Sequence, residues 1–283
     1  MNRMWTLLAC SSLLAGGALA AGGEHHGGEA VTSAQNAALE KNTEGKGYGP
    51  QSPRDLAKRK GTNQRVFNAA PPYRQMNLCN IHFHKNAEHK GGQFTTFAGH
   101  GDGHGYETGY KYSGKLSAAE SRPLEAPVCQ GEHGGLQVGD TVELHYVHST
   151  AQVLPGPTLN ACLSESDKNP QLRVEAQVFV LVNDPKAADF QRLVETGEVK
   201  GYQQALHIPR HTGQPVQYAG STTGPAYNEK GSPLQVTWSV RPRVVKVQAD
   251  TVGQWCKGNA FQEDHAHGVR NLVINEKLLS PIR

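Results

Sequence analysis

Five stretches of the chain have the hydrophobic pattern of β-strands. Each either alternates apolar and polar residues or is rich in β-branched and aromatic side chains. The stretches are NLCNIHFH (77–84), DTVELHYVHS (140–149), LRVEAQVFVLVN (172–183), LQVTWSV (234–240) and RVVKVQ (243–248). Turn-forming clusters such as GHGDGHG, LPGP and NEKGSP lie between them. The pattern predicts a protein built mainly from strands.

Helical patterns are few. The best candidate is DPKAADFQRLVETG, with Asp184 as its N-cap and Gly197 as its C-cap. The 283 residues include 32 Gly and 16 Pro, which suits a loop-rich β protein. We therefore predict a mainly β (β-dominated α+β) fold, with a single domain over residues 71–283 and a few peripheral helices.

The N-terminus has the features of a secretory signal peptide. Arg3 precedes an apolar run at residues 4–14, and the A-x-A sequence at residues 18–20 is a cleavage signal. This predicts a signal peptide over residues 1–20, a periplasmic or secreted protein, and no membrane association after cleavage, because no later stretch could cross a bilayer. Residues 21–70 are rich in Gly, Ala, Asn and Lys with little periodicity, and we expect a flexible or loosely packed extension.

Charge and cysteines narrow the possibilities further. The formal net charge is only +3, and without a basic block this argues against a nucleic-acid partner. Four cysteines remain after signal cleavage, and export favours two disulfides. Four cysteines allow three pairings. We predict Cys129–Cys162, which would brace the strand that carries His145, and Cys79–Cys256.

Histidine is unusually frequent, with 14 in the chain, and two histidines alternate in the first predicted strand. Residues at i and i+2 of a strand share a face, so Asn80, His82 and His84 point one way. Cys79 and Ile81 are expected on the opposite face with Phe83. Two such histidines can supply two ligands of a tetrahedral zinc site, and the side-chain oxygen of Asn80 can hold His82.

A third ligand has to come from another strand. In ELHYVH, His145 and Glu143 share a face, so the imidazole has a carboxylate beside it. Zinc-bound histidines commonly donate their second N–H to such an acceptor. The pattern therefore predicts a metal site of His82, His84 and His145.

These motifs, taken in order, resemble those of the carbonic anhydrases. HFHKNAEH, then VELHYVH, then YAGSTTGPA and LQVTWSV are similar to the site motifs of the α class, whereas GPTLNACLSE, NPQLRVE and QEDHAHGVRNL look more like the δ class. The resemblance implies a large twisted, mostly antiparallel sheet. It also implies a lyase that carries out the zinc-dependent, reversible hydration of carbon dioxide to bicarbonate by a metal-bound hydroxide. One Zn²⁺ per chain is expected, with Co or Cd as possible substitutes.

The resemblance also implies further site residues. Glu88 would accept a hydrogen bond from a threonine, which is Thr223 in an ungapped match and Thr222 with a one-residue gap. An apolar carbon dioxide pocket would be formed by Val147, Val236 and Trp238. The α-class proton-shuttle histidine has no clear counterpart, and His100 and His104 in GHGDGHG are the candidates. The α-class sequence T-T-P-P is TTGP here, which alters the expected pocket rim.

Two other interpretations remain open at this point. HFHKNAE also fits the H-x-H-x3-E pattern of cupin-like enzymes, in which Glu88 would be a ligand of iron or manganese. Alternatively, the histidine-rich loops could belong to an exported zinc-binding protein without enzymatic activity.

Overall fold

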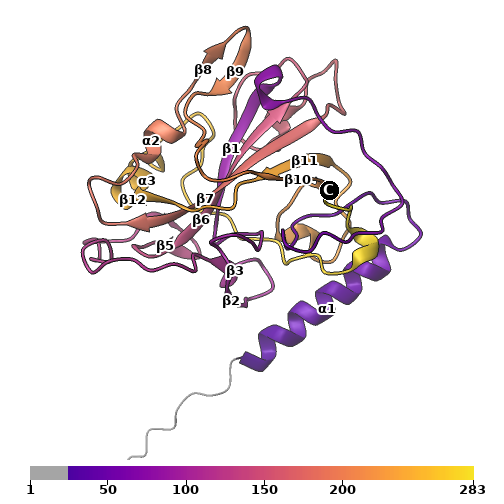
Figure 1. Cartoon of the computed structure of the whole chain (residues 1–283), viewed down its shortest axis with the longest axis horizontal. Coiled ribbons are helices and arrows are strands. Elements are labelled where there is room, and N and C mark those ends of the chain that lie inside the picture. The colour runs from indigo at the N-terminus through magenta and orange to yellow at the C-terminus, as the bar shows by residue number, and fades with distance from the viewer. Residues whose placement is uncertain (1–24) are drawn as a thin grey trace, which may run out of the picture.

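A six-stranded mixed sheet forms the centre of the computed structural model, which describes residues 25–283 (Figure 1). The predicted signal peptide lies outside the described residues. The strands follow the order β1-β6-β7-β11-β10, and β12 also pairs with β7. Their bounds are β1 (Asn77–Lys85), β6 (Thr141–Ser149), β7 (Leu172–Val182), β10 (Val216–Ser221), β11 (Gln235–Val240) and β12 (Val245–Gln248).

The sheet contains three antiparallel pairings, β1–β6, β6–β7 and β10–β11, and two parallel ones, β11–β7 and β12–β7. Strand β7 is central because β6 covers one edge, while β11 and β12 share the other. All of its residues are buried, including the polar residues Arg173, Glu175 and Gln177. The predicted mainly β fold is confirmed, and all five predicted strands are present.

Smaller elements surround the sheet. Three hairpins are β2 (Thr96–His100) with β3 (Thr108–Lys111), β4 (Val128–Gly131) with β5 (Gly134–Leu136), and β8 (Thr196–Val199) with β9 (Tyr202–Ala205). The helices are α1 (His25–Thr43), α2 (Phe190–Leu193) and α3 (Ala249–Trp255), with short 3₁₀ turns at Tyr73–Gln75, Leu159–Cys162, Pro225–Tyr227 and Glu276–Leu278. None of the helices in residues 25–283 is long and apolar enough to cross a membrane.

The helix predicted over residues 184–197 is much shorter than expected. Asp184 accepts a hydrogen bond from the backbone of Lys186 and forms a turn, whereas Asp189 caps the short helix α2 through the backbone N–H of Gln191. Residues from Thr196 onward form β8. Two aspartates could each cap a helix, and the pattern alone did not distinguish them.

The two faces of the sheet carry separate hydrophobic cores. Ile81 and Phe83 belong to the core that packs under α2 and α3, as expected. Cys79 does not, because a β-bulge shifts the β1–β6 register between Leu78 and Asn80 and turns Cys79 toward the other core. The prediction that Cys79 shares a face with Ile81 is therefore wrong.

The same shift explains the disulfides, whose predicted pairing is also wrong. The bonds are Cys79–Cys162 and Cys129–Cys256, with Cα–Cα separations of 4.9 and 5.4 Å. Cys79 and Cys162 lie in one core, whereas Cys129 and Cys256 lie in the other, where β4 meets the end of α3. The expected oxidation of all four cysteines is confirmed, and disulfides are typical of an oxidising compartment.

Part of the predicted loose extension is tightly packed. Gln51, Ser52 and Arg54 are fully buried, although the segment carries no hydrophobic periodicity. Its burial depends on polar contacts. The segment also packs closely against β10, because a Cβ atom added to Gly220 would lie only 1.9 Å from the Ser52 hydroxyl oxygen. The expectation of loose packing is wrong for this segment. The domain boundary near residue 71 stays a prediction.

Candidate metal centre

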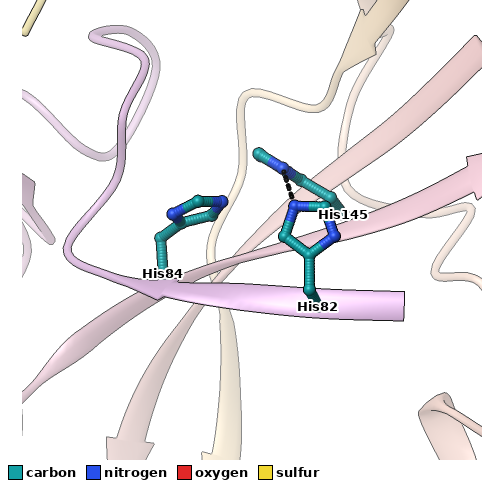
Figure 2. A group of neighbouring side chains, drawn as sticks. All are labelled: His82, His84 and His145. Carbon is teal, nitrogen blue, oxygen red and sulfur yellow. Dashed lines mark hydrogen bonds between the residues drawn. The ribbon is translucent and has the colours of Figure 1, made fainter. Parts of the chain in front are cut away.

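Three histidine side chains converge on one face of β1 and β6 (Figure 2). His82 and His145 are direct cross-strand partners, and His84 lies opposite Glu143. Ligand atoms of the three imidazoles all lie within 4.8 Å of one another. The i, i+2 spacing in β1 and the antiparallel register together produce this cluster, as the sequence predicted.

A hydrogen bond on the far side of its ring orients each β1 histidine. His82 Nδ1 lies 2.6 Å from Asn80 Oδ1, and Asn80 Nδ2 donates to the carbonyl of Gly156 at 3.1 Å. That second bond fixes the amide orientation, so Oδ1 accepts from His82. His84 Nδ1 donates to the carbonyl of Gly268 at 2.9 Å. Both histidines therefore carry their hydrogen on Nδ1 and leave Nε2 as a lone pair.

Glu143 orients the third histidine. Its Oε1 atom accepts from His145 Nε2 at 2.9 Å and from His89 Nδ1 at 2.7 Å. Its Oε2 atom accepts from the backbone N–H groups of Glu88 and His89 at 2.8 and 3.1 Å. Burial opposes ionisation of Glu143, but His89 and the hydrogen bonds from both histidines outweigh burial and hold its pKa well below the usual value. His145 thus presents Nδ1 as a lone pair.

Three lone pairs consequently face a common point. His82 Nε2 and His145 Nδ1 lie 3.2 Å apart, and His84 Nε2 is buried without a partner. Burial lowers the pKa of His82 well below its ordinary value and lowers that of His84 to about 4, so both are neutral at physiological pH. Three neutral nitrogen donors without hydrogens between them fit a Zn²⁺ ion.

Glu88 is completely buried but is not positioned as a fourth ligand. It lies on the outer side of two of the imidazoles, 3.8 Å from His84 Nδ1 and 3.9 Å from His145 Nε2. Its Oε1 atom accepts from the backbone N–H of Arg270 at 3.0 Å, and its Oε2 atom has no partner. A buried carboxylate oxygen without a partner calls for one more hydrogen-bond donor.

A small cavity of about 40 Å³ opens in front of the three histidines. Its walls include the three predicted pocket residues, Val147, Val236 and Trp238, together with Leu159, Leu172, Val174, Thr222 and Thr223. The Thr222 hydroxyl pairs with that of Ser232 at 2.5 Å. The hydroxyl of Thr222, the alternative threonine, therefore already has a partner. This favours Thr223 as the threonine whose hydroxyl is available to the cavity. Leu159 and the two β7 residues were not predicted from the sequence.

His267, which packs against two of the three histidines, was also not predicted from the sequence. Its ring centroid lies 6.1 Å from that of His82 and 5.9 Å from that of His84. Its Nε2 atom lies 2.8 Å from Glu263 Oε2; this hydrogen bond raises the His267 pKa although burial opposes it. The side chain is 42% exposed.

The two predicted shuttle candidates lie elsewhere. His100 packs against Phe97, and its carbonyl accepts from Thr32 of α1. His104 is exposed in a turn held by Asp102. Neither residue lines the cavity in front of the metal centre. His267 belongs to the QEDHAHGVRNL motif, which was noted in the sequence. The spacing of that motif, however, gave no indication that His267 would lie beside β1.

The fold and site therefore define a single-domain β protein with a three-histidine cluster that could hold a metal ion. The Delta carbonic anhydrase family model matches residues 73–251, well over half of the chain. The chain belongs to the delta carbonic anhydrase family, so it is an enzyme whose substrates are carbon dioxide and bicarbonate. The cupin-like and non-enzymatic interpretations are thereby ruled out. Comparison with curated protein sequences gives no match.

Solved α-carbonic anhydrases are among the structural neighbours. The enzyme from Photobacterium profundum is 19% identical, with 85% of this chain and 93% of that chain covered and a TM-score of 0.27. The enzyme from Thermovibrio ammonificans, solved with sulfanilamide, is 17% identical over 79% and 84%, with a TM-score of 0.27. Cah3 from Chlamydomonas reinhardtii, solved with acetazolamide, is 17% identical over 84% and 90%, with a TM-score of 0.29. At these TM-scores the similarities carry no argument for individual residues.

Proposed function

We propose that this carbonic anhydrase hydrates carbon dioxide with one zinc ion held by Nε2 of His82, Nε2 of His84 and Nδ1 of His145. The convergence of three lone pairs, each fixed by an acceptor on the far side of its ring, carries the proposal. Zinc bound by three neutral imidazoles supplies a hydroxide nucleophile near neutral pH, since it lowers the pKa of water to about 7 in carbonic anhydrase, the general example of this chemistry.

Thr223 and Glu88 orient the nucleophile in this proposal. The free Oε2 atom of Glu88 accepts the hydrogen of the Thr223 hydroxyl, which leaves the threonine oxygen able to accept only. That oxygen then takes the hydrogen bond of the nucleophile and directs a lone pair toward carbon. The effect is one of positioning, because Thr223 and Glu88 act only by holding the nucleophile in place.

The apolar wall of the cavity serves the substrate. Carbon dioxide carries no net charge, so Val147, Val236 and Trp238 can accommodate it without a hydrogen-bond donor. The same wall limits water near the three histidines, which strengthens the electrostatic interactions there. The pocket role of these residues thus follows from the apolar character of the substrate.

His267 takes the proton released by each turnover in this mechanism. Its ring packs against those of His82 and His84 and is partly exposed. Histidine suits proton transfer near neutral pH. We favour it over the other two candidates because its ring packs against those of two proposed ligands. His100 instead packs against Phe97, and His104 lies in an exposed turn.

Two disulfides and the N-terminal signal sequence support action in the periplasm or outside the cell. Zinc is the proposed metal, with Co or Cd as substitutes that the same donor set can hold.

The test combines metal analysis with stopped-flow hydration of carbon dioxide on the same purified sample. We expect about one zinc ion per chain, activity that is lost after removal of the metal with a chelator, and recovery when zinc is restored. Full activity in metal-free protein would contradict the proposal, and so would zinc-loaded protein without activity.

A further inference from the structure

Helix α1 lies outside the family match and packs along the molecule near β2 (Figure 1). One polar side chain of the helix, Gln35, is nevertheless only 8% exposed. Its Oε1 atom accepts from Asn271 Nδ2 at 2.7 Å, and its Nε2 atom donates to the carbonyl of Gly103 at 2.9 Å. Both polar atoms of the amide are thereby used, and they tie α1 to two segments distant in sequence.

Hydrogen bonds connect Asn271 and its neighbour Arg270 with the surroundings of both residues proposed to orient the nucleophile. The preceding backbone N–H, that of Arg270, donates to Glu88 Oε1 at 3.0 Å. The backbone N–H of Asn271 itself donates to Asn228 Oδ1 at 2.8 Å. Asn228 is buried and ends the short 3₁₀ turn that begins two residues after Thr223. A displacement of Asn271 would therefore disturb the hydrogen bonds that hold Glu88 and the loop after Thr223.

A second observation connects α1 with Glu88. Thr32 and Asn36 of α1 line a cavity of about 150 Å³ that Glu88 and Arg270 also line. The Oε2 atom of Glu88 is buried without a partner in the protein. Helix α1 thus forms part of the enclosure around the Glu88 carboxylate.

We propose that α1, through Gln35, positions the Glu88–Thr223 pair for catalysis. The inference rests on the proposed function, because the pair matters only if it orients the nucleophile. Gln35 touches neither substrate nor metal ligands and is a positioning residue. Loss of its amide should let Asn271 move and loosen the Arg270–Glu88 hydrogen bond, while the three histidines keep their own partners.

The first test replaces Gln35 in the full chain. Gln35→Ala should lower kcat roughly fivefold, the rate equivalent of one net hydrogen bond. KM and zinc content should stay unchanged, because the apolar wall and the ligands are untouched. Gln35→Glu retains the acceptor for Asn271 but loses the donor to the Gly103 carbonyl, so it should restore part of the rate. Ser33→Ala, an exposed change on the same helix, is the matched control and should have no effect.

The second test separates positioning from general loosening. In a Thr223→Ala background, Gln35→Ala should cause no further loss of kcat. In the Gln35→Ala single variant, amide hydrogen exchange should show that the Arg270 N–H is less protected than in the wild type. The inference would be overturned, and the proposed function left intact, by equal losses of kcat in the wild-type and Thr223→Ala backgrounds. An unchanged kcat in Gln35→Ala would have the same consequence. Full activity of zinc-loaded Thr223→Ala would overturn the proposed function and the inference together.

Discussion

His82 Nε2 lies 3.2 Å from His145 Nδ1, and neither atom carries a hydrogen. Asn80 takes the hydrogen of His82 on the far side of its ring, and Glu143 takes that of His145. Two lone pairs at this distance repel unless a cation lies between them. Two nitrogens bound to one tetrahedral zinc are separated by about 3.3 Å, given Zn–N bonds of about 2.0–2.1 Å. The pair is therefore already spaced for the metal.

Ligand replacements should follow from this geometry. Replacing any of His82, His84 or His145 with Ala should remove both zinc and hydration activity, since two ligands give too little affinity and the wrong geometry. Glu143→Ala should retain the metal but weaken its affinity about 10–100-fold. Competition with a zinc-binding dye measures both effects. Unchanged affinity in Glu143→Ala would contradict the role given to this carboxylate.

Thr223 and Glu88 should affect the rate and not the metal. Thr223→Ala should keep one zinc per chain and lower kcat by roughly 100-fold, in the range expected when an oriented group is lost. Glu88→Ala should do likewise, whereas Thr222→Ala should retain activity, because its hydroxyl is paired with Ser232. Metal analysis beside stopped-flow kinetics distinguishes these outcomes. A metal-free Glu88→Ala would indicate that the carboxylate is a ligand.

Proton transfer should depend on His267. His267→Ala should lower the hydration rate about 10-fold or more at low buffer concentration, and added imidazole should restore the rate by carrying the proton instead. His100→Ala and His104→Ala are the matched controls and should leave the rate unchanged at the same buffer concentration. If the hydration rate falls in His100→Ala or His104→Ala but not in His267→Ala, the proton is transferred by the GHGDGHG loop and not by His267.

Strand periodicity was sufficient to predict that the three histidines cluster. Alternation places His82 and His84 on one face, and the same rule places His145 beside Glu143. Periodicity could not predict the β-bulge before Asn80, which inverts the side of Cys79 and changes both disulfides. A bulge depends on how two strands pair, and one strand's pattern does not contain that information.

Contacts distant in sequence limited the prediction of the surrounding site. The carbonyl of Gly268 that orients His84 comes from 184 residues away, and no motif spacing connects the two. The buried segment around Ser52 is held by polar groups, so it lacks the apolar pattern that indicates a core. Such positions follow from the tertiary arrangement and not from local propensity.

Disulfide connectivity can be tested on protein that lacks residues 1–20, so that Cys10 is absent. Digestion without reduction should yield peptides that join Cys79 to Cys162 and Cys129 to Cys256. Denatured, unreduced protein should show about zero free thiols. Peptides joining Cys129 to Cys162 would instead support the pairing first expected from the sequence.

Stability should fall in acid partly through His148. This histidine is fully buried, its Nδ1 atom lies 3.1 Å from the carbonyl of Tyr146, and its Nε2 atom has no partner. Burial lowers its pKa to about 3, and the neighbouring Arg173 adds to the effect. The unfolded chain, with a histidine pKa of about 6.5, binds a proton that the folded chain does not. The contribution to stability is therefore complete above about pH 6.5 and is lost as the pH falls toward 3.

His148→Gln tests this, because glutamine keeps hydrogen-bonding capacity and does not titrate. At pH 8 the variant should be less stable than the wild type in urea unfolding, since a buried hydrogen bond is perturbed. Between pH 6.5 and 5 the wild type should lose about 1.4 kcal/mol per pH unit relative to the variant, so the gap should narrow by about 2 kcal/mol. His211→Gln, at an exposed position, should show the wild-type pH dependence. A gap that stays constant over this range would mean that His148 does not remain neutral in the folded protein.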